Sequence, residues 1–231
     1  MTPLEFRGTN PKVLYSGSEY ASRLEAKAGG FTWVKISDDL TGGPTPRGGS
    51  LYGTISAIGT GYTHAGLVYV GTDDGRLWRS KNADAANPAD VTWKRIKQPD
   101  VLPKRWVTRV KVSPMTDKWT VATFSAWRWL DGSDSPHVAL TKNNGKDWID
   151  ISSNLPDAPV NDVVWHPTDK KSLFVATDVG VFSTTDLGAT WQKVGANLPL
   201  VSVQEINIQT QTGTLFAATY GRSIWETSIT E

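Results

Sequence analysis

The chain consists of short apolar runs that are separated by turn-forming residues. Between Asn161 and Pro199, the runs VVW, SLFVAT, VGVFST and TWQKV are separated by Gly, Pro, Asp or Asn. Short runs rich in β-branched and aromatic residues, bounded by turn formers, are typical of strands. This stretch therefore predicts four consecutive antiparallel strands with tight connections.

The same unit recurs along the whole chain. Related copies of its second run begin at residues 15, 69, 121, 174 and 216, so successive copies are 54, 52, 53 and 42 residues apart. A four-stranded propeller blade takes roughly 40–50 residues. We therefore predict an all-β fold, a single β-propeller domain over residues 1–231 with about five four-stranded antiparallel blades. The blades are expected at about 4–37, 51–97, 105–153, 159–196 and 201–231.

The last unit is one strand short. In the two units before it, a tryptophan follows a threonine by seven residues, as in Thr141–Trp148 and Thr184–Trp191. Counting in the same way from Thr227 passes Glu231, the last residue. The last blade is therefore expected to lack its outer strand. Two interpretations follow: a small five-bladed ring that closes imperfectly, or the last five blades of a larger ring, which we favour.

A second repeated signature is the octet Thr184–Trp191, which has the form S/T-x-D-x-G-x-T-W. In such a turn an Asp side chain caps backbone amides, Gly adopts a positive φ, and Trp anchors the turn. A second copy spans Thr141–Trp148, and degraded copies lie at 80–93 and 29–33. We assign a structural role in these turns to Thr141, Asn143, Gly145, Trp148, Thr184, Asp186, Gly188 and Trp191.

These octets resemble Asp-boxes, the BNR repeats of sialidases, sortilin-type receptors and xyloglucanase-like glycoside hydrolases. The segments Asn154–Pro156, Asn197–Pro199 and Tyr220–Trp225 extend the resemblance over nearly the whole chain. It is nearest to bacterial secreted BNR-repeat propellers of unassigned function. The resemblance implies a propeller at an extracellular or cell-surface location. It does not imply an activity, because such boxes lie in turns of enzymes and non-enzymes alike.

Composition narrows the classes of partner. The 231 residues are 39% hydrophobic and carry a formal net charge of +1 without a basic block, so we expect no nucleic acid partner. No apolar run reaches the ~18 residues of a spanning helix, so we expect no membrane span. The absence of Cys excludes disulfides, Cys-zinc sites and cysteine nucleophiles.

Two further features concern metals and export. His64, His137 and His166 belong to three different units, so we expect no metal site and no cofactor. The first ten residues lack the apolar core of a signal peptide. If the native protein is exported, the chain is therefore expected to be a mature piece.

Topology indicates where a ligand would bind. Because strands alternate in direction, the loops between units and the loops between second and third strands emerge on one face, opposite the octets. Aromatic rings there could stack on sugars, while charged groups form hydrogen bonds. The candidate ligand-binding residues are Trp127, Arg128, Trp129, Trp106, Arg105, Arg76, Tyr220 and Arg222. Trp127 and Trp129 alternate and point the same way, so they are equally consistent with capping a blade.

We predict a non-catalytic propeller that recognises a glycan or a protein through this loop face. The alternative is a glycoside hydrolase, xyloglucanase-like or sialidase-like, which needs two carboxylates about 5–9.5 Å apart. Asp73, Asp162 and Asp178 could supply such a pair, although Asp73–Gly75 reads first as a hairpin turn. A third alternative is a structural module of a larger surface assembly, in contact with further blades or domains.

Overall fold

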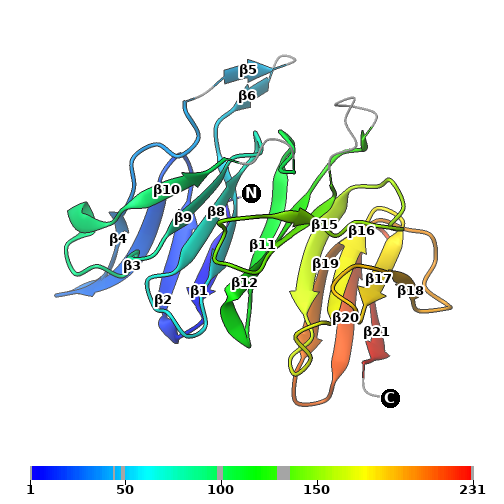
Figure 1. Ribbon diagram of the computed structural model, residues 1–231. Coiled ribbons are helices and arrows are strands. Elements are labelled where there is room, and N and C mark those ends of the chain that lie inside the picture. Colours follow the sequence, from blue (N-terminus) through cyan, green and yellow to red (C-terminus); the bar gives the residue numbers. More distant parts are fainter. Residues whose placement is uncertain (1, 44, 48–49, 98–100, 129–135, 230–231) are drawn as a thin grey trace.

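The computed structural model describes residues 2–43, 45–47, 50–97, 101–128 and 136–229. This part of the chain is built from five antiparallel sheets of three or four strands, which follow one another in chain order, and a separate two-stranded hairpin (Figure 1). The predicted all-β class and the succession of blade-like sheets are therefore confirmed.

The first two large sheets have four strands each. The first contains β1 (Leu4–Arg7), β2 (Asn10–Gly17), β3 (Ala21–Lys27) and β4 (Gly30–Lys35). The second contains β7 (Ile55–Thr60), β8 (Val68–Thr72), β9 (Leu77–Ser80) and β10 (Trp93–Ile96). A short 3₁₀ helix, η1 (Pro88–Asp90), lies in the insertion between β9 and β10.

The other three sheets repeat this order. The third contains β11 (Val107–Ser113), β12 (Thr116–Phe124), β13 (Val138–Thr141) and β14 (Ile149–Asp150). The fourth contains β15 (Val160–Trp165), β16 (Leu173–Thr177), β17 (Gly180–Thr184) and β18 (Gln192–Val194). The fifth contains β19 (Val203–Gln209), β20 (Thr214–Thr219) and β21 (Ile224–Ser228), and among the described residues it has no fourth strand.

Each sheet packs on the sheet before it through its first strand. Strand β7 contacts β1 and β2, β11 contacts β7 and β8, β15 contacts β11 and β12, and β19 contacts β15 and β16. The first strand of every sheet is thus innermost and the last strand outermost, as in a series of propeller blades.

The connection between the first and second sheets contains regular structure. The Gly/Pro-rich segment that begins at Asp38 leads into a hairpin of β5 (Thr45–Arg47) and β6 (Ser50–Tyr52), in which Thr45 pairs with Tyr52. In sequence, two short segments flank a Gly-Gly pair, a combination that favours a two-residue hairpin turn. The hairpin projects from the upper side of the sheets in Figure 1.

The core lies in layers between neighbouring sheets. Adjacent residues of one strand point to opposite faces, so Val70 packs between the first and second sheets and Tyr69 between the second and third. Similar clusters separate the third sheet from the fourth and the fourth from the fifth. Every inner sheet is therefore apolar on both faces.

The octets form turns with a shared arrangement of hydrogen bonds. The Thr184 hydroxyl donates to Asp186 Oδ1 (2.7 Å) and accepts from the Gly188 amide (2.9 Å), while Asp186 Oδ1 accepts from the Thr190 amide (2.9 Å). In 141–148 the hydroxyl of Thr141 and the side-chain oxygen of Asn143 make the equivalent bonds.

The degraded copy at 80–93 forms the same set of side-chain hydrogen bonds, which we call the clamp, in spite of its insertion. Asn82 Oδ1 accepts from both the amide and the hydroxyl of Thr92, each at 3.0 Å, and the Asn82 amide donates to the Ser80 hydroxyl (3.2 Å). Thr92 lies ten positions after Asn82, and the insertion between them is therefore accommodated without loss of the turn.

The tryptophans Trp33, Trp93, Trp148 and Trp191, which we call the turn tryptophans, depend on the preceding sheet. The Trp93 indole donates to the Ile36 carbonyl, and the Trp191 indole to the Ile151 carbonyl, each at 2.8 Å. Trp148 is 1% exposed and packs in the cluster between the second and third sheets. Trp33, in the first sheet, is 46% exposed. The socket for a turn tryptophan is thus supplied mainly by the sheet before it.

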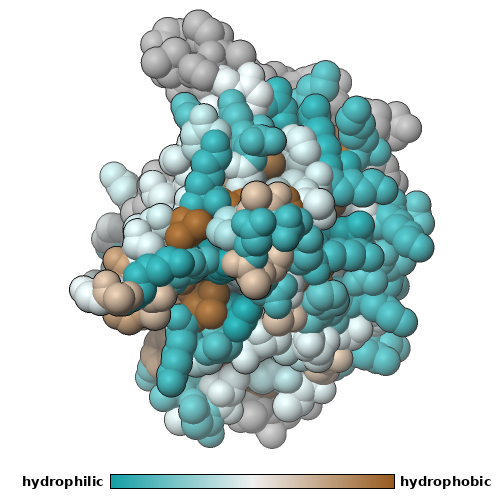
Figure 2. Space-filling model, turned by 90° about the vertical axis from the view of Figure 1, so that its left-hand side faces the viewer, coloured by the Kyte–Doolittle hydropathy of each residue, from teal (hydrophilic) through white to brown (hydrophobic). Residues whose placement is uncertain are grey.

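The first sheet also exposes apolar side chains. Leu4, Phe6, Phe31 and Trp33 are all at least 46% exposed. The side of the molecule that lies on the left of Figure 1 is mostly hydrophilic, with separate brown and tan areas of apolar atoms (Figure 2).

The difference in burial between the turn tryptophans predicts how much each one contributes to stability. Trp191→Ala removes a buried ring and should lower the free energy of unfolding by about 3–5 kcal/mol. Trp33→Ala removes a half-exposed ring and should cost less than about 1 kcal/mol. Urea unfolding of both variants checks this, and equal losses would contradict the dependence on a preceding sheet.

Candidate functional site

A recurring backbone hydrogen bond defines the loop face, the rim formed by the residues before each first strand and after each second strand. In four sheets, the amide after the second strand donates to the carbonyl before the first. The pairs are Asp73 with Thr54 (3.1 Å), Ser125 with Trp106 (3.0 Å), Asp178 with Pro159 (3.2 Å) and Tyr220 with Ser202 (2.8 Å). Asp73, Asp178 and Tyr220 therefore occupy equivalent places on one rim.

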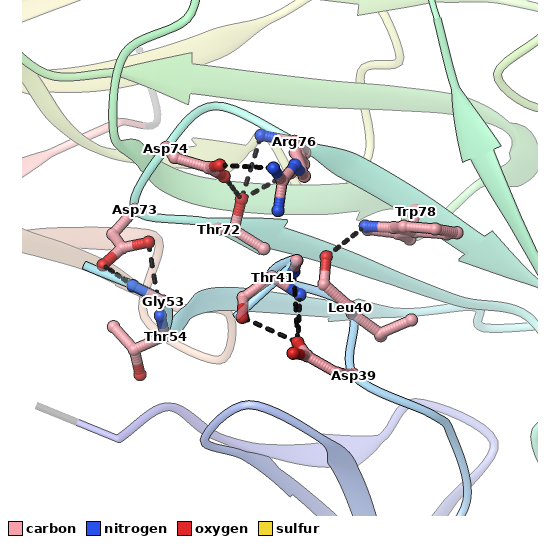
Figure 3. A network of polar contacts seen from close by, with 11 residues as sticks. Asp39, Leu40, Thr41, Gly53, Thr54, Thr72, Asp73, Asp74, Arg76 and Trp78 are labelled. Atoms are coloured by element: carbon pink, nitrogen blue, oxygen red, sulfur yellow. Dashed lines mark hydrogen bonds and ion pairs between the residues drawn. The ribbon is translucent and has the colours of Figure 1, made fainter. Parts of the chain in front are cut away.

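Asp73 is used inside the second sheet. It is 6% exposed, and its carboxylate accepts from the amides of Gly53 (3.0 Å) and Thr54 (3.2 Å) (Figure 3). These bonds fix the entry into β7 against the end of β8. The carboxylate thus stabilises the loop from within.

The neighbouring Asp74 forms an ion pair with Arg76. Asp74 Oδ2 lies 3.2 Å from Arg76 Nη2, and Asp74 Oδ1 accepts from the Thr72 hydroxyl at 2.6 Å (Figure 3). The hairpin turn expected at Asp73–Gly75 is present, with Gly75 at φ +84°. Arg76, a predicted ligand-binding residue, is therefore partly committed to holding this turn.

Asp162 and Asp178 also have partners within the fold. Asp162 is 2% exposed; its Oδ1 lies 2.7 Å from Arg109 Nε, and its Oδ2 accepts from the Ile206 amide (3.1 Å). Asp178 Oδ1 accepts from the Ser202 hydroxyl (2.6 Å) and the Asn161 amide group (2.9 Å). Both carboxylates join the fourth sheet to its neighbours.

The ion pair with Asp162 holds Arg109 charged. Burial of the guanidinium lowers its pKa, but the charge and hydrogen bond of Asp162, together with Glu205 and Glu5, raise the pKa above the ordinary value. Glu5 in β1 also pairs with Lys111 in β11 (3.0 Å). The innermost strands are thus linked by charged groups that are satisfied by one another.

A buried polar network holds the long loop after β12. Arg105 is 5% exposed, and its guanidinium donates to the carbonyls of Ser125 (3.3 Å), Ala126 (3.2 Å) and Pro136 (2.8 Å). Sequence reasoning proposed Arg105 as a ligand contact. The structure places it beneath the loop, where it supports the neighbouring side chains.

His137 and Asp157 complete this network. Arg105 can only donate, so His137 Nδ1 accepts from it (3.5 Å) and Nε2 donates to Asp157 Oδ1 (2.8 Å). Burial lowers the pKa of His137, and the hydrogen bond to Asp157 acts in the opposite direction without reversing the shift. Sequence reasoning did not identify Asp157, because no motif links it to His137, 20 residues away.

The same carboxylate orients the candidate aromatic loop. Asp157 Oδ1 accepts from the Arg128 amide at 3.0 Å, and Trp127 and Arg128 are half-buried. Trp129 lies outside the described residues, so its predicted alignment with Trp127 stays a prediction.

The remaining candidates face solvent. Trp106 is 39% and Tyr220 is 77% exposed, and Arg222 is exposed as well. The turn that carries Tyr220 and Arg222 uses positive φ at Gly221 (+80°) and Ser223 (+60°), and the Trp225 indole donates to the Arg222 carbonyl (2.8 Å). These residues present aromatic and cationic groups on a constrained turn.

Five carboxyl groups in the described part of the chain have a pKa that differs from the ordinary value. The carboxyl groups with a shifted pKa (Glu25, Asp39, Asp157, Asp169 and Asp186) all shift downward. A general acid of a glycosidase requires a raised pKa. Among the described residues, no group of three or more His, Asp or Glu could hold a metal ion. Nor does that part contain a helix long and apolar enough to cross a membrane.

Comparison with known sequences gives one partial match. No family model matches the chain. A stretch of 119 residues is 27% identical to the vacuolar protein sorting/targeting protein 10 of Leptosphaeria maculans, which corresponds to 52% of this chain and 7% of that protein. The chain thus spans a small fraction of that relative.

Comparison with solved structures shows the fold. A GH74 xyloglucanase from Xanthomonas campestris superposes with a TM-score of 0.70 at 13% identity, over 97% of this chain and 36% of that chain. The Cps50 (Swd1) β-propeller domain of Myceliophthora thermophila superposes with a TM-score of 0.62 at 12% identity, over 97% of this chain and 64% of that chain. The chain has a β-propeller fold, shared by an enzyme and by a propeller domain of another kind.

The octet carboxylate leads to a pH prediction. Hydrogen bonds from the hydroxyls of Thr184 and Thr190 lower the pKa of Asp186 to about 2. Its contribution to stability should be complete above the unfolded-state pKa of about 3.9 and be lost as the pH falls toward 2. Thr190→Ala removes one donor and should raise this pKa. An NMR titration of the Asp186 carboxyl measures both values, and an unshifted pKa in the parent protein would contradict the clamp.

Proposed function

We propose that the protein is a non-catalytic binding propeller that recognises a glycan or a protein through its loop face. The observation that carries this proposal is a difference between two groups of side chains on that face. The three carboxylates Asp73, Asp162 and Asp178 bond to neighbouring groups of the fold, whereas Trp106, Tyr220 and Arg222 are exposed. Aromatic and cationic groups on a rigid scaffold are what sugar rings or a protein epitope bind.

The supporting side chains fit this division. Arg105 and the His137–Asp157 pair hold the loop after β12 from below. A loop that is ordered before binding loses less conformational entropy when a ligand arrives. The proposed contact residues are Trp106, Trp127, Arg128, Trp129, Tyr220 and Arg222, with Arg76 at the edge.

The rival proposal is a glycoside hydrolase. The likeness to a GH74 xyloglucanase favours it at the level of the fold, but identity is only 13%. Hydrolysis would require one of the three carboxylates to leave its present partners and act as a base or nucleophile. Because their bonds join strands and sheets, we place the enzyme second.

We further propose that the chain is an Asp-box propeller of an extracellular or cell-surface protein of bacterial origin. The clamp shared by the octets supports the Asp-box assignment. The exposed apolar side chains of the first sheet support a contact with a further blade or domain. A structural module in a larger assembly would share both features.

A glycan-array screen tests the binding proposal. The parent chain should bind a defined set of glycans, and the double variant Trp106→Ala/Tyr220→Ala should bind them about tenfold or more weakly. Phe31→Ala is the matched control, because this exposed ring lies in β4, away from the loop face. It should leave binding unchanged.

Other outcomes separate the alternatives. If the array is negative and a protein partner is captured in a Tyr220-dependent manner, the ligand is a protein. Release of sugar from xyloglucan or a sialoside by the parent chain, lost in Asp73→Asn with the fold intact, would overturn the non-catalytic assignment.

A further inference from the structure

Two lysine side chains lie near one indole ring on the octet rim, the edge formed by the octet turns and by the hairpins that join first and second strands. The ammonium group of Lys142 is 5.4 Å from the centre of the Trp119 ring, and that of Lys170 is 5.8 Å from it. A cation within about 6 Å of a ring centre is attracted by the π face. Trp119 therefore gathers two positive charges at one place.

Backbone hydrogen bonds place these groups on the same rim. In the third sheet, the Asn144 amide of the octet turn donates to the Lys118 carbonyl in β12 (2.9 Å). In the fourth sheet, the Leu187 amide of the octet turn donates to the Lys171 carbonyl before β16 (3.0 Å). In both sheets the octet turn thus lies beside the first hairpin, and two neighbouring sheets bring one lysine each to the ring of Trp119.

The indole ring of Trp119 is a fixed surface. Trp119 is half-buried and packs against the core cluster between the third and fourth sheets. Its ring centre lies 6.4 Å from that of Trp165, at an angle of 40°. Trp165 is 7% exposed, and its indole donates to the Lys111 carbonyl (3.1 Å). Because the ring is held from below, little conformational entropy is lost when a ligand packs on it.

The two lysines do not block this ring. In the contact between Lys35 and Tyr20, the ammonium group lies only 3.6 Å from the ring centre. The ammonium groups of Lys142 and Lys170 lie about 2 Å farther out, and both residues are exposed. The exposed part of the indole and the two cations are therefore accessible to the same ligand.

Carboxylates of the fold do not pair with these lysines. The ion pairs of the described residues involve other cations. The carboxylates on the neighbouring turns accept hydrogen bonds from other groups: Asp117 from the His64 amide (2.5 Å), Asp147 from the Asn143 side chain (2.7 Å) and Asp169 from the Ser172 hydroxyl (2.5 Å). Each ammonium group carries three donors, so Lys142 and Lys170 can donate to an anion from solution.

We propose that Trp119, Lys142 and Lys170 form a binding site for an acidic sugar, a pyranose that carries a carboxylate or a sulfate group. The apolar face of the sugar packs on the indole. The two ammonium groups donate to the charged oxygens, in hydrogen bonds that are stronger than those between neutral groups. The site lies on the rim opposite the loop face and is separate from the contact residues proposed there.

An acidic sugar fits these groups better than other anions do. A nucleic acid takes much of its affinity from many phosphate contacts, about 6–10 in a typical complex, whereas the site offers two cations and the chain has a formal net charge of only +1. An acidic peptide side chain would use the lysines and leave the indole face empty. One flat ring with one anionic group uses all three side chains.

Calorimetry with two probes tests the proposal on the full chain. An oligogalacturonate presents carboxylates, and a heparin oligosaccharide presents sulfates. We expect at least one of them to bind, and to bind more weakly as salt screens the charges. For the carboxylate, methyl-esterified oligogalacturonate has the same rings without the charge and should bind about tenfold or more weakly.

Variants of the site should separate charge from stacking. Lys142→Ala/Lys170→Ala removes both cations and should weaken binding about 30-fold or more. Trp119→Leu keeps an apolar side chain in the cluster and should weaken binding about tenfold, with the fold checked by thermal unfolding. Lys146→Ala is the matched control, because Lys146 is an exposed lysine of the same octet turn and makes no ring contact among the described residues. It should bind like the parent chain.

A second readout locates the ligand. The indole N–H resonance of Trp119 should shift when the acidic sugar binds, and that of Trp106 on the loop face should not. Binding should also persist in Trp106→Ala/Tyr220→Ala, so this proposal and the one for the loop face can fail independently. Loss of binding in that variant would place the acidic sugar on the loop face and overturn the proposal.

Three other results would overturn it as well. The first is that neither acidic probe binds. The second is that Lys146→Ala weakens binding as much as Lys142→Ala/Lys170→Ala, since binding would then depend on general charge. The third is that a single-stranded oligonucleotide binds in a Trp119-dependent manner while both acidic sugars do not, which would make a nucleic acid the ligand.

Discussion

The structure depends on a contact that each sheet makes with the sheet before it. The side chain of a turn tryptophan packs against the preceding sheet and donates to a carbonyl there, as Trp93 and Trp191 do. A single antiparallel sheet cannot bury both of its faces. The contact therefore makes stability a property of neighbouring pairs, as in other repeat proteins.

The octet turns make this contact reproducible. In each turn a side-chain hydroxyl and a carboxylate or amide oxygen accept from the backbone amides, so the turn before the tryptophan forms in the same way in each copy. The degraded copy illustrates this, because Asn82 still accepts hydrogen bonds from Thr92 across the insertion that contains η1. Local hydrogen bonds of this kind are short-range and survive changes elsewhere in the loop.

The same local character explains which features could be predicted from sequence. Strands, their order and the octet turns depend on period-2 patterns and nearby residues, and β2, β8, β16 and β20 lie where the runs placed them. The site residues depend on distant partners. Nothing near Asp162 indicates that it pairs with Arg109, 53 residues away, and nothing near Arg105 indicates that it lies beneath a loop. The hydrogen bonds that the Asn154 side chain makes with the Trp191 backbone could have been found, because Asn-Leu-Pro occurs twice at equivalent positions.

The buried carboxylates hold strands and sheets together, and this affects what they could do in a reaction. A catalytic carboxylate must change its protonation state or partner during a reaction, and its surroundings must tolerate both states. Removing Asp162 from Arg109 would leave a partly buried cation unpaired, which is costly. Tyr220 and Arg222 are held in place through the backbone of their turn. Their exposed side chains can therefore contact a ligand without breaking a bond that holds the fold together. This difference is the physical reason why we propose a fixed binding surface and place proton transfer second.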